Sequence, residues 1–429
     1  MESRQSNIHS LFESRKDCTE WNTSYPLRID DWAPYRVQEA LSFNGVNELS
    51  FYIHIPFCKQ ICAFCEYSRI AGPNDETQNR YLQCLRQDIL SFIKAHDCDI
   101  TLDGFDIGGG TPTSLSEDNF AYLLDIYDEV IGMCKTSPDF ESSIEGTFYT
   151  LSEKKINRIV SSGIKRLSLG VQSTSGEVLE QVNRQNAHID DMLHWMRIAW
   201  ESGIEKINLD LMYGLQKQSA SAIDADLSVL RALKPQQVTL YELRTNMISQ
   251  KEIPNKSELY DQYSHYFSGL ISLGYIARFG QNTFSVDDSD YGVSSYLRSR
   301  MLMGVPYKGF GISAQSMSPN GISYNIGKAT NMTRRALSES SFKEEFTYNL
   351  PPKELAAKYI AIAAYNGSFS LTRVSELLGT DAWEYYKEEF EYCIDLGLLN
   401  IENGRAFITE LGFKYYGAVF SLFYAKNDR

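Results

Sequence analysis

Three cysteines, Cys58, Cys62 and Cys65, crowd into eight positions of this sequence, whereas the other five cysteines are scattered singly. Three thiolates at this spacing on one loop can bind three irons of a [4Fe–4S] cluster and leave the fourth iron without a protein ligand. Such an iron can chelate a small molecule through adjacent amino and carboxylate groups and pass an electron to it. A structural zinc site completed by His54 is the alternative, although zinc sites usually take a second ligand pair from another loop and none follows here. We favour the cluster over zinc, and zinc over three unrelated thiols.

Polar residues and glycines also gather where the expected strands end. Glycine after a strand lets backbone amides approach a carboxylate closely, and Glu145 has no cationic neighbour in the sequence, so its carboxylate can accept from an ammonium or from ribose hydroxyls. A zwitterionic ligand with a ribose needs an amide, a cation and carboxylates. Taken singly, each residue could instead be a helix cap, an ion pair or a buried hydrogen bond, most seriously Arg184. The candidates are Gly109, Gly110, Thr111, Glu145, Gln172, Arg184 and Asp210.

The elements that must position these residues alternate between short strands and helices. Six such units in series predict an α/β fold with a parallel sheet and right-handed crossovers, as an open doubly wound sheet or an open (β/α)6 barrel. In either architecture the site forms at the carboxyl ends of the strands. The expected strands are 50–55, 104–109, 142–146, 166–172, 207–214 and 237–243, and the expected helices are 77–95, 117–131, 152–161, 190–202 and 219–232.

The chain divides into four segments by pattern. Residues 1–48 are an N-terminal extension, 49–243 the (β/α)6 core, 244–350 a mixed α/β extension and 351–429 a helical unit. In the last segment a turn at Asn403-Gly404 between β-rich and helical stretches is typical of a winged helix. Its local acidity favours a role as a lid or docking unit over DNA binding.

The net charge and the apolar runs of the sequence limit the kinds of ligand and the cellular location that we expect. The formal net charge is −14, which argues against nucleic acid as the main ligand. No apolar run reaches 18 residues, and the N-terminus lacks the apolar core of a signal peptide, so we expect a cytoplasmic protein. In that compartment the cysteines are not a disulfide framework.

Several motifs in order make the chain resemble the radical S-adenosylmethionine (SAM) proteins similar to oxygen-independent coproporphyrinogen III oxidase. They are YIHIPFC, the three-cysteine loop, GGGTPT at 108–113, LSLGVQS at 167–173, VNRQ at 182–185 and NLDLMYGL at 208–215. The resemblance covers roughly residues 52–316 and is weaker in the C-terminal unit. It implies an open (β/α)6 partial barrel, a [4Fe–4S] cluster, SAM as cofactor and an electron donor such as flavodoxin or ferredoxin.

The same resemblance implies roles for particular residues. Tyr52 and Glu145 would act at the reaction centre, and Glu145 would also contact the SAM on the cluster. A second SAM would lie against the glycine loop and a later segment near Ala314 and Gln315. The further expected contacts to the first SAM are Gln172, Arg184 and Asp210.

Three departures bear on the reaction. The decarboxylating oxidases that resemble this chain have a further cysteine at the position of Tyr67. The haem-chaperone branch has a histidine–asparagine pair that is absent from residues 291–299 of this chain. The proline that usually follows YGL in the family is replaced by Gln216. A third branch uses both SAM molecules for methyl transfer or C–C bond formation on unsaturated small molecules, and we favour this activity. Ring opening of a tetrapyrrole by methylation, oxidative decarboxylation of a porphyrinogen and a non-catalytic haem carrier are the alternatives.

Overall fold

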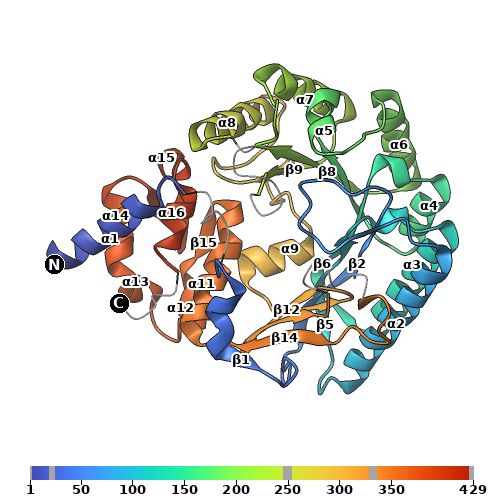
Figure 1. Ribbon diagram of the computed structural model, residues 1–429, viewed down its shortest axis with the longest axis horizontal. Coiled ribbons are helices and arrows are strands. Elements are labelled where there is room, and N and C mark those ends of the chain that lie inside the picture. Colours follow the sequence, from blue (N-terminus) through green and yellow to red (C-terminus); the bar gives the residue numbers. More distant parts are fainter. Residues whose placement is uncertain (1, 19–24, 245–253, 328–335, 425–429) are drawn as a thin grey trace.

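A curved sheet with helices along its outer side forms the centre of the molecule (Figure 1). The computed structural model describes residues 2–18, 25–244, 254–327 and 336–424. Six parallel strands lie side by side in chain order, so each crossover helix packs against the strands that it joins. These strands are β2 (Glu48–Ile55), β5 (Thr101–Gly109), β6 (Lys135–Gly146), β7 (Arg166–Gln172), β8 (Lys206–Tyr213) and β9 (Gln237–Glu242).

The outer helices cover the apolar face of this sheet. On α2 (Asp75–Ala95), the first of these outer helices, Tyr81, Leu85 and Ile89 recur at a spacing of four residues and are buried, as expected of a helix with one apolar side. Phe105 and Ile107 of β5 are fully buried in the same core. The helices are α2 (Asp75–Ala95), α3 (Glu117–Met133), α4 (Glu153–Ser161), α5 (Gly176–Gln181), α6 (Ile189–Ser202), α7 (Ala220–Leu233) and α8 (Lys256–Ser272).

The sheet continues beyond the six expected units. The extension after residue 244 adds a strand parallel to β2 and then antiparallel strands, and the short strand at 36–37 lies at the far edge. The resulting 12-stranded sheet is open, which confirms the partial barrel and excludes the closed one. The added strands are β10 (Thr283–Ser285), β11 (Tyr307–Phe310), β12 (Gln315–Ser318), β13 (Gly321–Asn325), β14 (Glu344–Asn349) and β1 (Arg36–Val37).

Residues 286–304, called the plug below, pack on the inner face of the sheet near the amino ends of its strands. The plug includes α9 (Ser295–Leu297) and the π-helix η5 (Arg298–Met303). Its backbone packs so closely on β5 that a Cβ at Gly104 would lie 2.2 Å from the amide nitrogen of Tyr296. The plug therefore meets the inner face of the sheet directly.

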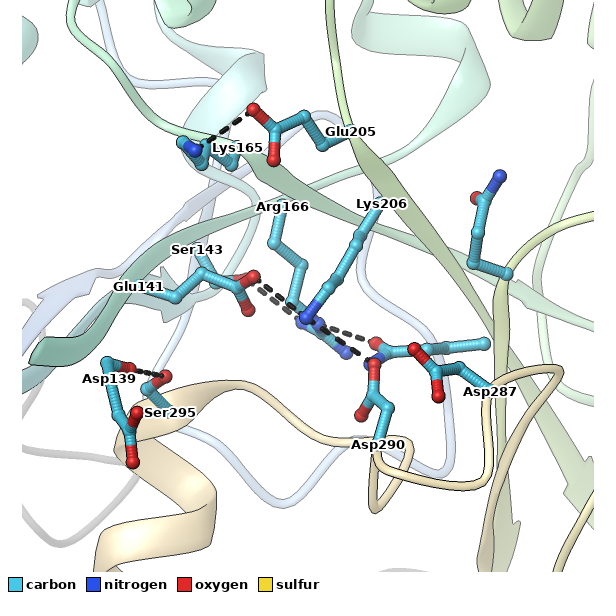
Figure 2. A network of polar contacts seen from close by, with 12 residues as sticks. Asp139, Glu141, Ser143, Lys165, Arg166, Glu205, Lys206, Asp287, Asp290 and Ser295 are labelled. Atoms are coloured by element: carbon cyan, nitrogen blue, oxygen red, sulfur yellow. Dashed lines mark hydrogen bonds and ion pairs between the residues drawn. The ribbon is translucent and has the colours of Figure 1, made fainter.

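Ion pairs tie this plug to the strands. Lys206, the first residue of β8, contacts Glu141 at 2.9 Å and Asp290 of the plug at 3.4 Å (Figure 2). The buried Arg166 side chain beside them donates to Ser143 at 2.8 Å and to Gln237 at 2.7 Å. The amino end of the barrel is thus a polar, hydrogen-bonded floor.

The C-terminal segment forms a helical unit with a small antiparallel sheet of order β15-β17-β16. The expected turn at Asn403-Gly404 joins the last two strands as a hairpin, with both residues at positive φ. The strands are β15 (Ser368–Ser370), β16 (Leu399–Glu402) and β17 (Arg405–Ile408), and the helices are α11 (Pro352–Ala363), α12 (Leu371–Leu378), α13 (Ala382–Tyr385), α14 (Lys387–Asp395), α15 (Glu410–Phe413) and α16 (Tyr416–Ser421).

The N-terminal helix α1 (Glu2–Arg15) packs on this unit, far along the chain from its own position (Figure 1). Ile8 and Phe12 are buried there, and Phe12 contacts the rings of Tyr392 and Tyr415 edge-on. In the described part of the chain, no helix has the length and apolar character needed to cross a bilayer.

Candidate functional site

The three-cysteine loop lies at the carboxyl end of β2. It is pinned at both ends by a two-stranded parallel pair, β3 (Phe57–Cys58) and β4 (Ile70–Ala71), in which Cys58 lies opposite Ala71. In the middle, the amide of Ala63 donates to the carbonyl of Val182 at 2.9 Å. These contacts hold the loop against the top of the barrel.

Hydrogen-bond donors face all three sulfurs, with the backbone amide of Tyr67 serving Cys65. The Thr111 hydroxyl lies 3.7 Å from Sγ of Cys58, and the Arg184 guanidinium lies 3.6 Å from Sγ of Cys62. Burial raises the pKa of the Cys58 thiol to about 11, against the lowering effect of Thr111, and burial likewise raises the pKa of Cys65. Without a bound cation these thiols therefore keep their protons. A cation such as iron stabilises the thiolate form that binds it.

His54 is engaged in other hydrogen bonds. Its Nε2 donates to the carbonyl oxygen of Ser68 at 2.9 Å, and its Nδ1 lies 3.3 Å from the hydroxyl of Tyr52. A carbonyl only accepts, so the proton is on Nε2, and Nδ1 accepts from Tyr52. With both ring nitrogens occupied, His54 is poorly suited to complete a zinc site.

The glycine loop after β5 runs beside the cysteines. The amides of Gly110 and Thr111 donate to the carbonyls of Ile55 and Phe57, each at 2.8 Å. A Cβ at Gly110 would lie 2.7 Å from the Phe57 carbonyl oxygen and 3.0 Å from Sγ of Cys58, so only glycine permits this approach.

Glu145 reaches the same loop from β6. Its carboxylate accepts from the amide of Gly109 at 3.0 Å. A Cβ at Gly108 would meet this carboxylate at 2.5 Å, so the glycine before the loop makes room for it. The expected proximity of Glu145 to the glycine loop is therefore found.

Three carboxyl groups share the inner face of the sheet. Burial, followed by the charge of Asp210, raises the pKa of Glu145 to about 7. Burial raises the pKa of Asp210 to about 6 and that of Asp106 to about 7, while nearby Arg166 lowers both. The raised pKa values mean that burial of these carboxyls outweighs the stabilising charge of Arg166.

Gln172 is strained and incompletely bonded. It has a φ of 65°, in the left-handed region that favours glycine, and its buried Oε1 has no hydrogen-bond partner among the described residues. The following loop is fixed by Asp226, which accepts from the hydroxyl of Ser173 at 3.1 Å and from the backbone amide and hydroxyl of Thr174. Arg184 anchors to the carbonyl of Gly170 and reaches Cys62.

Tyrosines surround the carboxylates on the inner side. Tyr52 stacks on Tyr296 of the plug with ring centroids 5.6 Å apart, and burial raises its pKa well above the usual value, so its hydroxyl stays protonated. Tyr241 of β9 packs against Tyr365 of the C-terminal unit at 5.8 Å. Tyr67, in the place of the additional cysteine, has a half-exposed side chain.

Ala314 and Gln315 lie apart from the glycine loop. Two strands, β11 and β2, separate β12 from β5, which is three inter-strand spacings of ~4.8 Å each. Ala314 is buried, and Gln315 Oε1 accepts from the hydroxyl of Tyr307 and from Arg300 at 3.0 Å. An extended ligand would be needed to contact both segments.

The residues present fit a cluster and an adenosyl amino acid. Three cysteines share one loop with donors to sulfur, a glycine cradle borders Cys58, and an unpartnered amide oxygen and carboxylates with raised pKa values line the strand ends. The sites thus offer acceptors for an ammonium and for hydroxyls, and thiolates for iron.

Some residues of this region were not found from the sequence. Asp106 occupies an inward position between Gly104 and Gly108, which is a recognisable signal because a carboxylate within a buried strand needs a partner. Arg300 and Asp226 gave no such signal, since their surroundings come from distant parts of the chain.

Comparisons with known proteins agree with this geometry. Residues 52–229 match the radical SAM superfamily. The haem chaperone HemW of Bacillus subtilis is 35% identical over 198 residues, 45% of this chain and 50% of that protein. The oxygen-independent coproporphyrinogen III oxidase of Escherichia coli is 27% identical over 287 residues, 63% of this chain and 61% of the oxidase. The chain thus matches between half and two thirds of the length of these relatives.

A solved structure supports the fold over a longer range. The structure of Escherichia coli coproporphyrinogen III oxidase, HemN, described as a radical SAM enzyme, superposes with a TM-score of 0.72 at 22% identity, covering 88% of this chain and 90% of that one. Residues 52–229 are therefore a radical SAM domain, in a chain that has the fold of HemN and whose relatives include haem chaperones and oxygen-independent coproporphyrinogen III oxidases.

Proposed function

We propose that this protein is an enzyme that cleaves SAM reductively at a [4Fe–4S] cluster held by Cys58, Cys62 and Cys65, and that it acts on a conjugated small molecule of the tetrapyrrole class. The observation that carries the proposal is the meeting of the cysteine loop, the glycine loop and Glu145 at the carboxyl ends of β2, β5 and β6. When bound, the cluster supplies the electron that splits SAM into methionine and a 5′-deoxyadenosyl radical.

The residues around that centre bind and orient SAM and stabilise the cluster. Glu145, Asp210 and the Gln172 amide oxygen present acceptors to an ammonium and to hydroxyls. Arg184 and Thr111 donate toward cluster sulfurs, which stabilises their negative charge and tunes the reduction potential. Tyr52 holds its proton toward His54, so that it can donate to a substrate after rotation.

The proposed reaction is radical methyl transfer or C–C bond formation with a second SAM. Its support is the substitution of the additional oxidase cysteine by Tyr67, whose side chain is half-exposed beside the cysteine loop. Decarboxylation of a porphyrinogen propionate is the second candidate, favoured by the relatives named as coproporphyrinogen III oxidases. A haem carrier is the third, favoured by the relatives named as haem chaperones.

One experiment separates these activities. The cluster is reconstituted without oxygen, reductant and SAM are added, and 5′-deoxyadenosine and S-adenosylhomocysteine are quantified together. Comparable amounts of both products support methyl transfer, whereas 5′-deoxyadenosine alone supports hydrogen abstraction from substrate, as in decarboxylation. Haem binding without SAM cleavage would contradict both enzymatic proposals.

A further inference from the structure

Arg300 is a guanidinium enclosed at the inner end of the barrel by neutral groups. It donates from Nη2 to the Oε1 atom of Gln315 at 3.0 Å and from Nη1 to the hydroxyl of Tyr296 at 3.4 Å. Its charge lies over the ring of Tyr307, 4.7 Å from the centroid. Its buried Nε has no hydrogen-bond partner among the described residues, and no carboxylate there lies within ion-pair distance of Arg300.

A neighbour in the same π-helix shows the contrast. Arg298 forms an ion pair with Asp139 at 3.3 Å. Burying a guanidinium without a counter-charge is costly, so such a group is generally paired or awaits an anion. Asp106 is a nearby carboxyl: burial raises its pKa to about 7, and Arg300 is among the cations that lower it. Its Oδ2 accepts from the hydroxyl of Ser294 at 2.6 Å, and its buried Oδ1 has no hydrogen-bond partner among the described residues.

The C-terminal unit fixes the π-helix that carries Arg300. The Tyr359 hydroxyl donates to the carbonyl of Leu302 at 2.9 Å, and Arg373 donates to the carbonyl of Gly304 at 2.8 Å. A Cβ at Gly304 would lie 2.7 Å from Nε of Arg373, so this contact is close. The guanidinium is thus held in place by two units of the molecule before any ligand arrives, which lowers the entropic cost of binding.

We propose that Arg300, with Tyr296, Tyr307 and Gln315 around it, is a carboxylate-binding subsite of the barrel interior. The planar guanidinium has five N–H donors, and its printed bonds to Gln315 and Tyr296 use two of them, so N–H groups remain for a carboxylate. The tyrosine rings offer flat apolar contact to the conjugated body of the ligand. The carboxylate belongs either to the substrate or to the methionyl group of a second SAM. The inference rests on the proposed function for the identity of these ligands.

Binding of a porphyrin and of SAM distinguishes the two possible sources of the carboxylate, the substrate and a second SAM. Coproporphyrin III, with its carboxylates, and its tetramethyl ester are titrated into cluster-loaded protein, and the stoichiometry of radiolabelled SAM is measured by equilibrium dialysis. The variants are R300Q, R300K and the control R298Q. R298Q removes the outward arginine of the same π-helix.

A substrate carboxylate at Arg300 predicts that R300Q weakens coproporphyrin III binding about tenfold or more, while ester binding is unchanged. R300K should recover part of the affinity, because it keeps the charge and loses the fork. A second SAM there predicts instead that R300Q lowers the SAM stoichiometry from two to one per chain. R298Q should match the wild type in both measurements.

The subsite is overturned if R300Q binds both ligands as the wild type does. It is also overturned if the wild type binds neither coproporphyrin III nor a second SAM. Equal losses for the acid and its ester would also overturn it, because they indicate a structural role. Formation of 5′-deoxyadenosine by the wild type in the same preparations shows separately whether the radical chemistry stands.

Discussion

At the scale of single residues, the cysteine loop makes the sharpest prediction. Replacing Cys58, Cys62 or Cys65 by alanine removes one cluster ligand, so we expect loss of most bound iron and of 5′-deoxyadenosine formation, by at least about a hundredfold. Iron analysis and product quantification after anaerobic reconstitution check this. Cys134→Ala, which alters a free cysteine outside the loop, is the matched control. Retained SAM cleavage in any loop variant would refute the ligand assignment.

Glu145 predicts a dependence of SAM binding on pH. Its pKa is raised to about 7 by burial and by the charge of Asp210. Below that pH the carboxyl is protonated and neutral, and above it the carboxylate attracts an ammonium. We therefore expect SAM affinity to rise about tenfold between about pH 6 and pH 8, as the ionised fraction grows.

The comparison is with Glu145→Gln in the same cluster-loaded state. The amide cannot ionise, so this variant should bind SAM weakly with a flatter pH profile and a normal iron content. An identical profile in both proteins would show that another group controls the titration.

The gathering of the cysteine loop, the glycine loop and Glu145 was predictable, because cysteine spacing and strand-end polarity are local in the sequence. The meeting of Glu145 with Gly109 followed from parallel strands having their carboxyl ends at one edge. The environment of Arg300 was not predictable. Its neighbours are the uncharged side chains of Gln315 and Tyr307, which only tertiary packing brings to it.

At the scale of elements, helix α7 positions the loop after β7. Asp226 of this helix is fully buried and accepts hydrogen bonds from Ser173, Thr174 and Tyr266. The loop directly follows Gln172, whose φ of 65° must be maintained by such contacts. Asp226 thus acts through Gln172 and is a positioning residue.

Asp226→Asn should weaken SAM binding about tenfold, because the amide turns a donor toward groups that already donate. Iron content should remain normal, which separates this effect from cluster loss. Asp224→Asn on the same helix is the control, since Asp224 is exposed and pairs with His265 at 2.8 Å. Unchanged SAM affinity in Asp226→Asn would show that the loop holds its conformation without this carboxylate.

All six strands of the core were predicted, and the strand expected at 166–172 has the observed bounds of β7, whereas β6 begins at Lys135 rather than at 142. Alternation of strand and helix signals is local, which explains this accuracy. The addition of β11 to the same sheet was not predicted, because it pairs with β2 about 250 residues earlier, and only tertiary packing selects that partner.

At the scale of the whole molecule, the two ends of the chain support each other. Phe12 of α1 is buried against Tyr392 and Tyr415 of the C-terminal unit. Phe12→Ala should destabilise that unit by about 3 kcal/mol, the usual order for a buried phenylalanine. Hydrogen exchange should report faster opening of α14 and α16, with the strands of the barrel unchanged.

His9→Ala, on the same helix, removes an exposed contact to Tyr392 and is the control. We expect little change in exchange from it. Equal protection of α14 and α16 in Phe12→Ala and the wild type would mean that the unit folds independently of α1.

The floor of ion pairs and the plug at residues 286–304 have a kinetic consequence. Lys206, Glu141 and Asp290 form ion pairs at the amino end of the barrel (Figure 2). We therefore expect molecules to pass in and out at the carboxyl end, where the cysteine loop follows β2. If a ligand binds beside Arg300, as proposed above, we expect it to lie deeper than one bound at the strand ends. Arrival and departure should then follow a compulsory sequence, with the deeper ligand first to enter and last to leave, and initial-rate patterns should be those of an ordered mechanism.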